Sequence, residues 1–202
     1  MQLLVVLAII CPMLFCGGMI KSVQASEATP TVKAVLDQAM EIQTRADLAG
    51  EDKRPERRRL IGKLIQGSFI FSEMAKDALK ENWDRLAAGQ RSEFQRLFSQ
   101  LFQDSYTRMV LNFLQRESID YKGETAESQG MLVKTVILRA NEHIPVDYHL
   151  IQQSGRWLIR DVDIDGVSIV ENYRNTFRQV IRSSSFEGLL NKMRLQTKAL
   201  QD

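Results

Sequence analysis

The chain contains few of the residues on which disulfide-stapled or metal-stabilised folds depend. Its 202 residues include two cysteines, Cys11 and Cys16, and two histidines, His143 and His149. Both cysteines lie in an apolar N-terminal segment, so the remaining chain cannot form a disulfide. The histidines are six residues apart, which is not the i, i+4 spacing of a helical metal-binding pair. The sequence therefore predicts neither a metal site nor a bound cofactor.

An excess of charge of either sign is also missing. The chain has 27 Lys and Arg residues against 25 Asp and Glu residues, a formal net charge of +2. Nucleic-acid binding needs a concentrated positive surface, and the near balance gives no sign of one. One local basic cluster lies between Lys53 and Arg59. We interpret it as a solvated helix face, with contact to a phosphate or an anionic membrane surface as the alternative.

Motifs for nucleotide binding and nucleophilic catalysis are absent from the sequence. There is no glycine-rich phosphate loop, and Ser168 does not lie in a nucleophile-elbow motif. No cysteine accompanies the two histidines as a nucleophile. We therefore expect that the protein is not an enzyme.

The first 25 residues have the pattern of a secretory signal. Leu3 to Ile20 is apolar apart from Pro12 and a glycine pair, and Val23-Gln-Ala25 supplies small residues before a cleavage point. We expect cleavage near Ala25, export to the periplasm, and a single mature domain over residues 26–202. The alternative is an uncleaved anchor, although the proline and glycines make a poor spanning helix.

Hydrophobic spacing of three and four residues predicts helices at both ends of the mature chain. The strongest pattern runs from Gln90 to Leu114, over six turns. A short helix is expected after Ser72 as its N-cap, and the last helix is expected to carry a Ser184…Glu187 capping box. Two further helices are predicted to begin at Pro30 and Pro55. Two more are predicted to span Val167 to Arg182 and Phe186 to Leu200.

Between the helical regions the apolar period changes to two, which is typical of strands. A tight hairpin is expected at Ser154-Gly155. The four predicted strands are Ile119 to Gly123, Met131 to Arg139, Ile144 to Gln152 and Arg156 to Ile164. This order predicts an α+β fold, with helices packed on one face of a curved antiparallel four-stranded meander.

The segment from Asp161 to Phe177 changes hydrophobic period in its middle, so a strand ends at Asp165-Gly166 and a helix follows at once. Its aspartates also occupy the first, third and fifth places of an EF-hand calcium loop. The twelfth place is Asn172 instead of Glu, and the incoming segment is strand-like, so we interpret the segment as a strand-to-helix junction. If Arg174 is buried, it needs a carboxylate partner, and Asp161 or Asp163 is the candidate for this clamp.

The same junction resembles the signature of the MlaC family, soluble periplasmic carriers that move phospholipid between the two membranes of diderm bacteria. The resemblance covers about residues 30 to 195. Ile70 and Lys80 depart from it, because the family usually has Asp and Gly there, and Ile169 and Asn175-Thr176 also differ. The matching residues are Phe71, Met74-Ala75, Leu79, Trp83, Gln90-Arg91, Glu93-Phe94, Val146-Asp-Tyr148, Trp157, Asp161, Gly166-Val-Ser168, Asn172-Tyr-Arg174 and Phe177.

The resemblance implies a deep apolar cavity between sheet and helices, holding a diacyl phospholipid. It also implies a monomer whose partners are an inner-membrane transporter complex and an outer-membrane lipoprotein complex. The apolar pattern alone is compatible with a solid core as well. Candidates for the cavity lining are Phe71, Met74, Leu79, Trp83, Phe94, Phe98, Leu101, Val133, Val136, Tyr148, Leu150, Trp157, Val170, Tyr173 and Phe177. The structural signature comprises Asp161, Gly166, Ser168, Asn172 and Arg174.

Two other functions remain open at the level of sequence. One is a periplasmic carrier or chaperone for another apolar cargo, such as an isoprenoid or hopanoid. The other is a small enzyme with a cone-shaped pocket, in which an Asp or His acts on a bound substrate.

Overall fold

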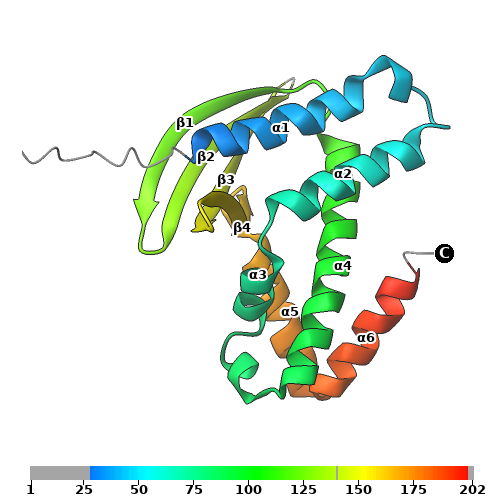
Figure 1. Cartoon of the computed structure of the whole chain (residues 1–202), viewed down its shortest axis with the longest axis vertical. Coiled ribbons are helices and arrows are strands. Elements are labelled where there is room, and N and C mark those ends of the chain that lie inside the picture. The colour runs from blue at the N-terminus through cyan, green and yellow to red at the C-terminus, as the bar shows by residue number, and fades with distance from the viewer. Residues whose placement is uncertain (1–27, 140, 200–202) are drawn as a thin grey trace, which may run out of the picture.

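The computed structural model describes residues 28–139 and 141–199, which form an α+β fold of six α-helices and five strands (Figure 1). The predicted signal and its cleavage point near Ala25 lie outside the described residues. The α-helices are α1 (Thr29–Thr44), α2 (Arg54–Ser68), α3 (Phe71–Leu79), α4 (Ala88–Phe113), α5 (Ile169–Ser183) and α6 (Phe186–Ala199). The strands are β1 (Ser118–Glu127), β2 (Gly130–Arg139), β3 (Glu142–Gln153), β4 (Arg156–Ile164) and β5 (Val167–Ser168). Two short 3-10 helices, η1 (Ala46–Leu48) and η2 (Lys80–Arg85), connect helices.

The strands form one antiparallel sheet in the order β1-β2-β3-β4-β5, which confirms the predicted meander. The fifth strand was not expected, because Val167 was assigned to the following helix. Asp165 and Gly166 both have positive φ, 51° and 77°, the conformation of a tight hairpin turn. This turn brings Val167 and Ser168 back against Ile164 and Asp163 before α5 begins.

The molecule has two differently built ends, which Figure 1 shows at top and bottom. At one end, α1, α2 and the C-terminal half of α4 lie against one face of the sheet. At the other end, α3, α5 and α6 surround the N-terminal half of α4. No helix in the described ranges has the length and apolarity needed to cross a membrane.

The helical end is filled by packed aromatic rings. Phe94 and Phe98 of α4 are fully buried, and their rings lie 5.5 Å from Phe177 and 5.4 Å from Tyr173, respectively. Tilted and edge-on ring pairs at this spacing add to the free energy gained by burying the surface. Removing one such ring costs about 3–5 kcal/mol, so this end supplies much of the stability.

Two predicted helix caps are wrong. Ser72 lies inside α3, which begins at Phe71 after Ile70, and Ile70 has no side-chain acceptor for the first helical amides. At α6 the cap is Ser185 instead of Ser184, because the Ser185 hydroxyl oxygen accepts from the Gly188 amide at 3.0 Å. The N-cap of α3 thus lies two positions before the predicted Ser72, and that of α6 lies one position after the predicted Ser184.

Candidate functional site: an apolar cavity under the sheet

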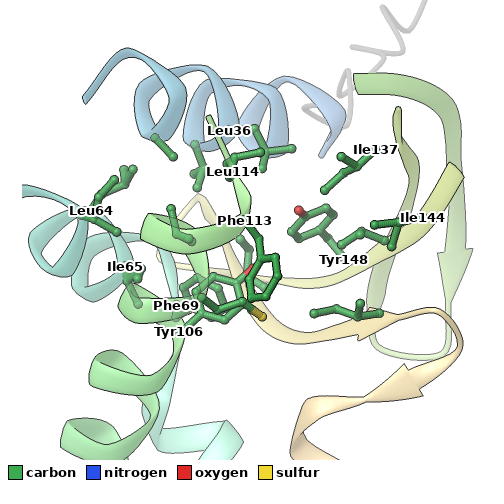
Figure 2. A pocket seen from close by; sticks show the side chains of 18 of the residues that line it. Leu36, Leu64, Ile65, Phe69, Tyr106, Phe113, Leu114, Ile137, Ile144 and Tyr148 are labelled. Atoms are coloured by element: carbon green, nitrogen blue, oxygen red, sulfur yellow. The ribbon is translucent and has the colours of Figure 1, made fainter. Parts of the chain in front are cut away.

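A cavity of about 310 Å³ lies between the sheet and helices α1, α2 and α4. Figure 2 shows Leu36 and Leu64 of the helices, and Leu114 just after α4, on one side, with Ile137, Ile144 and Tyr148 from the strands on the other. The ring of Phe113 lies between the two groups. The full lining is Val35, Leu36, Ala39, Ile61, Leu64, Ile65, Phe69, Tyr106, Met109, Val110, Phe113, Leu114, Ile137, Arg139, Ile144, Val146, Tyr148, Ile159 and Ile164.

Element periodicity explains why this wall is apolar. On β3, Ile144, Val146 and Tyr148 lie two residues apart and therefore share the face that looks at the helices. On α4, Tyr106 and Val110 lie one turn apart and extend the apolar stripe beyond the packed rings. The result is a space enclosed on two sides by aliphatic groups, which suits an apolar ligand.

Two tyrosine hydroxyls are the polar groups deepest in this wall. Tyr106 of α4 and Tyr148 of β3 hydrogen-bond to each other through these hydroxyls. Burial raises the pKa of both phenols above the ordinary value of 10, and the mutual hydrogen bond opposes this rise for Tyr106. Both groups therefore stay neutral at physiological pH and add no charge to the interior.

The rim of the cavity is formed where α4 ends and β2 ends. Phe113 is 59% exposed, although its ring also lines the cavity. Arg139 lies beside it, with its guanidinium carbon 5.8 Å from the ring centroid and Nη2 3.2 Å from the Phe113 carbonyl oxygen. Nη2 of Arg139 is also 3.3 Å from a carboxylate oxygen of Glu117. The wall is thus apolar within and charged at its edge.

Of the lining candidates chosen from the sequence, Tyr148 lies in this wall. Phe71 is close by, since its ring lies 6.3 Å from that of Phe69, which lines the cavity. The others lie outside the wall: Met74, Leu79, Trp83, Phe94, Phe98, Leu101, Val133, Val136, Leu150, Trp157, Val170, Tyr173 and Phe177. Most of them pack in the filled helical end or at its junction with the sheet. Contact between these residues and a ligand stays a prediction.

Strand alternation separates Val133 from Val136. Val133 is fully buried together with Thr135, while Val136, three residues on from Val133, belongs to the opposite face of β2. The cavity-facing residues of β2 are instead Ile137 and Arg139. Counting every second residue along β2 from Val133 reaches both positions, so the alternation of the strand is the signal in the sequence that could have identified them.

Sequence reasoning missed lining residues on α1, α2, α4 and the strands. Those on α1 and α2 include Leu36, Ala39, Ile61 and Ile65, which recur at the three- and four-residue spacing of an apolar helix face. Their spacing shows that they face inward, and it carries no information on whether the space opposite them is filled. Only the distance between the helices and the sheet decides that.

The structural signature forms the hydrogen-bonded joint between β4 and α5. Oδ2 of Asp161 accepts from the Ser168 hydroxyl at 2.5 Å, and Oδ1 accepts from the amides of Val162 and Val170 at 2.8 and 3.1 Å. The Ser168 oxygen caps α5 by accepting from the Glu171 amide at 2.9 Å. Burial raises the pKa of Asp161 above its ordinary value, and these hydrogen bonds act in the opposite direction.

A bulge in β4 orients this joint. His149 pairs with Asp161 and Leu150 pairs with Ile159, so Arg160 has no opposite residue. The extra residue changes the phase of β4, which places Asp161 on the outer face and Val162 in the core. The remaining signature residues are Gly166, in the hairpin turn, and Asn172, exposed on α5.

The predicted clamp between Arg174 and an aspartate of β4 is wrong. Nε of Arg174 donates to the backbone carbonyl oxygen of Asp77 on α3 at 2.9 Å. The Asp77 carboxylate is bound by Arg160 instead, with Nη2 2.8 Å from Oδ2. Arg174 therefore joins α5 to α3, and Arg160 joins β4 to the same point of α3.

The basic cluster between Lys53 and Arg59 has partners within the protein. Arg57 donates to the carbonyl oxygens of Leu48 and Gly50, and Arg59 pairs with Glu56. Arg58 pairs with the Asp104 carboxylate of α4. Arg57 and Arg58 therefore tie α2 to its neighbours, whereas Arg59 pairs within the helix.

No group of three or more His, Cys, Asp or Glu side chains suited to a metal ion occurs among residues 28–139 and 141–199. The oxygens of Asp161 are taken up by a hydroxyl and two amides, an arrangement that fits a helix cap better than a calcium loop.

No curated protein matches the chain significantly. Among solved structures, the chain is similar to a phospholipid-binding protein from Ralstonia solanacearum that was solved in complex with a phospholipid. The two share 21% identity and a TM-score of 0.74, and the match covers 88% of this chain and all of the other. The model of the MlaC protein family matches residues 33–195. The chain therefore belongs to the MlaC family, whose members are lipid-binding carriers and not enzymes.

Proposed function

We propose that the protein is a periplasmic phospholipid carrier that holds the acyl chains of one lipid in the cavity under the sheet. The observation that carries the proposal is the apolar wall, in which aliphatic and aromatic side chains from α1, α2, α4 and three strands face one space. Family membership supports the periplasmic location and the lipid cargo. We further propose that residues 26–202 act as a single monomeric domain after cleavage near Ala25.

The energetics of such a cargo determine how it is released. Each methylene transferred from water gains about 0.8 kcal/mol, so two chains of about 16 carbons represent on the order of 25 kcal/mol. This exceeds the roughly 18–21 kcal/mol at which noncovalent affinities saturate. Spontaneous release into water is therefore too slow for a carrier. We propose that the protein docks on a transporter complex in the inner membrane and a lipoprotein complex in the outer membrane, and passes the lipid from cavity to cavity.

The size of the cavity predicts a movement on loading. Its volume of about 310 Å³ lies at the lower end of the roughly 300–1,000 Å³ found for small-ligand pockets. A diacyl lipid is larger than the ligands that such pockets hold. We expect α1 and α2 to move away from the sheet when both chains enter, since these helices form the wall opposite the strands.

The first experiment asks what the purified protein contains and what it takes up. We expect native mass spectrometry and solvent extraction to detect one diacyl phospholipid per protein, and the lipid-free protein to regain it from phospholipid vesicles. A protein that carries no diacyl lipid and takes up none contradicts the proposal. Extraction of an isoprenoid or hopanoid in its place favours the alternative cargo.

A matched pair of substitutions tests the location of the lipid. Ala39 lines the cavity on α1, whereas the adjacent Gln38 is exposed. Ala39→Trp should fill part of the cavity and lower lipid uptake, with the protein still folded by circular dichroism. Gln38→Trp adds the same side chain to the outer face of the helix and should leave uptake unchanged. Equal uptake by both variants would place the lipid elsewhere.

A further inference from the structure

Arg139 differs from the other residues of the cavity wall in its chemistry. Among the described residues that line the cavity, it alone has a charged side chain. It follows Thr135 and Ile137 on the helix-facing side of β2, so the inward residues of this strand run from the buried interior to a cation at the rim. A phospholipid has the same order of chemistry, with apolar chains followed by an anionic phosphodiester.

We propose that Arg139 binds the phosphodiester group of the lipid at the mouth of the cavity. This inference rests on the proposed function, because it assumes that the acyl chains occupy the apolar space behind the arginine.

The contacts of Arg139 hold its guanidinium at the rim. Nη2 lies 3.2 Å from the Phe113 carbonyl oxygen and 3.3 Å from Oε1 of Glu117, and the guanidinium stacks near the Phe113 ring. The Arg139 side chain is 34% exposed, whereas that of Glu117 is 8% exposed. The arginine is therefore fixed from the protein side by a buried carboxylate and remains open to a ligand from the other.

The guanidinium retains donors for a phosphate. Both polar contacts of Arg139 with described residues use Nη2, and the planar fork also presents Nε and Nη1. A phosphodiester accepts two parallel hydrogen bonds from such a fork, which a lysine ammonium cannot supply in the same geometry. Partial burial strengthens this interaction relative to one in bulk water.

The negative end of the α4 dipole does not prevent an anion from binding here. Gln43 of α1 donates to the carbonyl oxygens of Val110, Leu111 and Leu114, and Arg139 itself donates to that of Phe113. The last carbonyls of α4 are thus largely satisfied within the protein. A purely structural role for Arg139 as a cap of α4 is the alternative that an experiment must separate from phosphate binding.

The test compares two cargoes that differ in the phosphate. Phosphatidylcholine vesicles containing either pyrene-labelled phosphatidylcholine or pyrene-labelled diacylglycerol are incubated with lipid-free protein, and equilibrium uptake is measured by fluorescence. We expect Arg139→Gln to lower phosphatidylcholine uptake about tenfold, the order of one charge-assisted hydrogen bond, with diacylglycerol uptake unchanged. Arg139→Lys should recover part of the loss. An equal loss for both cargoes, or no loss for either, overturns the proposal.

Control variants distinguish a selective loss of phosphate binding from a loss of folding and from a failure of the proposed carrier function. Arg178→Gln removes the same charge from the exposed face of α5 and should change neither uptake. If Arg139→Gln is destabilised by its unpaired Glu117, the double variant Arg139→Gln/Glu117→Gln removes both charges and should show the same selective loss. Failure of the wild-type protein to take up either cargo refutes the carrier function itself, and not only the role of Arg139.

A final arm separates a lipid headgroup from a free anion. Glycerophosphocholine and inorganic phosphate at millimolar concentrations should not compete with phosphatidylcholine uptake, because they lack the chains that supply most of the affinity. Competition by either at these concentrations would show that Arg139 belongs to a soluble-anion site and would overturn its assignment to the lipid.

Discussion

The side-chain amide nitrogen of Gln43 lies 2.8 Å from the carbonyl oxygen of Leu114, so the end of α1 caps the end of α4. The same nitrogen lies 3.1 Å from the carbonyl oxygens of Val110 and Leu111. Gln43 thereby fixes the position at which α4 stops and the rim of the cavity begins.

We predict that Gln43→Ala lowers the free energy of unfolding by about 1–2 kcal/mol, because partly buried carbonyl groups lose their donor. The change is measured by urea denaturation. Gln38→Ala removes the same group from the exposed face of α1 and should cost less than about 0.5 kcal/mol. Equal stability of the two variants would mean that the α4 carbonyls are satisfied by water.

Lys80 has a backbone conformation that favours glycine. Its φ of 51° and ψ of −123° lie outside the regions that residues with a Cβ adopt without strain. The position ends α3, and it is one of the two at which we expected the sequence to depart from an Asp or Gly usual in the MlaC family. We predict that Lys80→Gly stabilises the protein by about 1 kcal/mol, as the relief of strain exceeds the added entropy of the unfolded chain.

Thermal denaturation measures this gain, and Lys76→Gly provides the control. Lys76 is exposed inside α3, where glycine costs about 1 kcal/mol relative to a good helix former. The two substitutions should therefore shift the midpoint in opposite directions. A decrease in both would show that Lys80 is not strained in solution.

Local patterns were sufficient to predict the elements of the fold. The apolar repeat from Gln90 to Leu114 corresponds to α4, and alternation with turn residues gave the meander. These signals depend on neighbours within a few residues along the chain. β5 was missed because two residues are too few to show a period.

The cavity could not be located in the same way. Phe98 packs against Tyr173, whereas Ile61 faces the cavity. Both side chains are apolar and follow the same helical spacing, so the sequence does not distinguish them. Whether the space opposite a side chain is filled depends on the placement of elements far apart in sequence. The partner of Arg174 could not be predicted for a similar reason. Its acceptor is the backbone carbonyl oxygen of Asp77, and a pattern of side chains does not show which carbonyl group is available.

His149 should make stability depend on pH in the neutral range. Nδ1 lies 3.0 Å from Oε1 of Glu127, and Nε2 lies 3.3 Å from Oδ2 of Asp163. Burial alone would lower the pKa of His149, but the hydrogen bonds to the two carboxylates outweigh it and raise the pKa above 6.5. This contribution to stability is fully present below the unfolded pKa of about 6.5 and is lost as pH rises through the folded value.

We predict that the wild-type protein loses stability as the pH rises above about 6.5, and that His149→Gln reduces this slope, as measured by denaturation at several pH values. His143→Gln changes an exposed histidine at the start of β3 and should retain the slope. A slope that persists in His149→Gln would assign the pH dependence to another group.

Gly130 lies where β2 begins and the chain passes close to β3. Its φ is 107°, and a Cβ at this position would lie 1.8 Å from the carbonyl oxygen of Leu150, a backbone atom that cannot rotate away. Gly130→Ala should therefore destabilise the protein by at least about 3 kcal/mol. Gly89→Ala, in the first turn of α4 with no atom within 4 Å of the added methyl group, should stabilise it by up to about 1 kcal/mol. Urea denaturation of both variants compares the two effects. Near-wild-type stability of Gly130→Ala would show that β2 and β3 lie farther apart in solution, because a contact this close leaves no space for a methyl group.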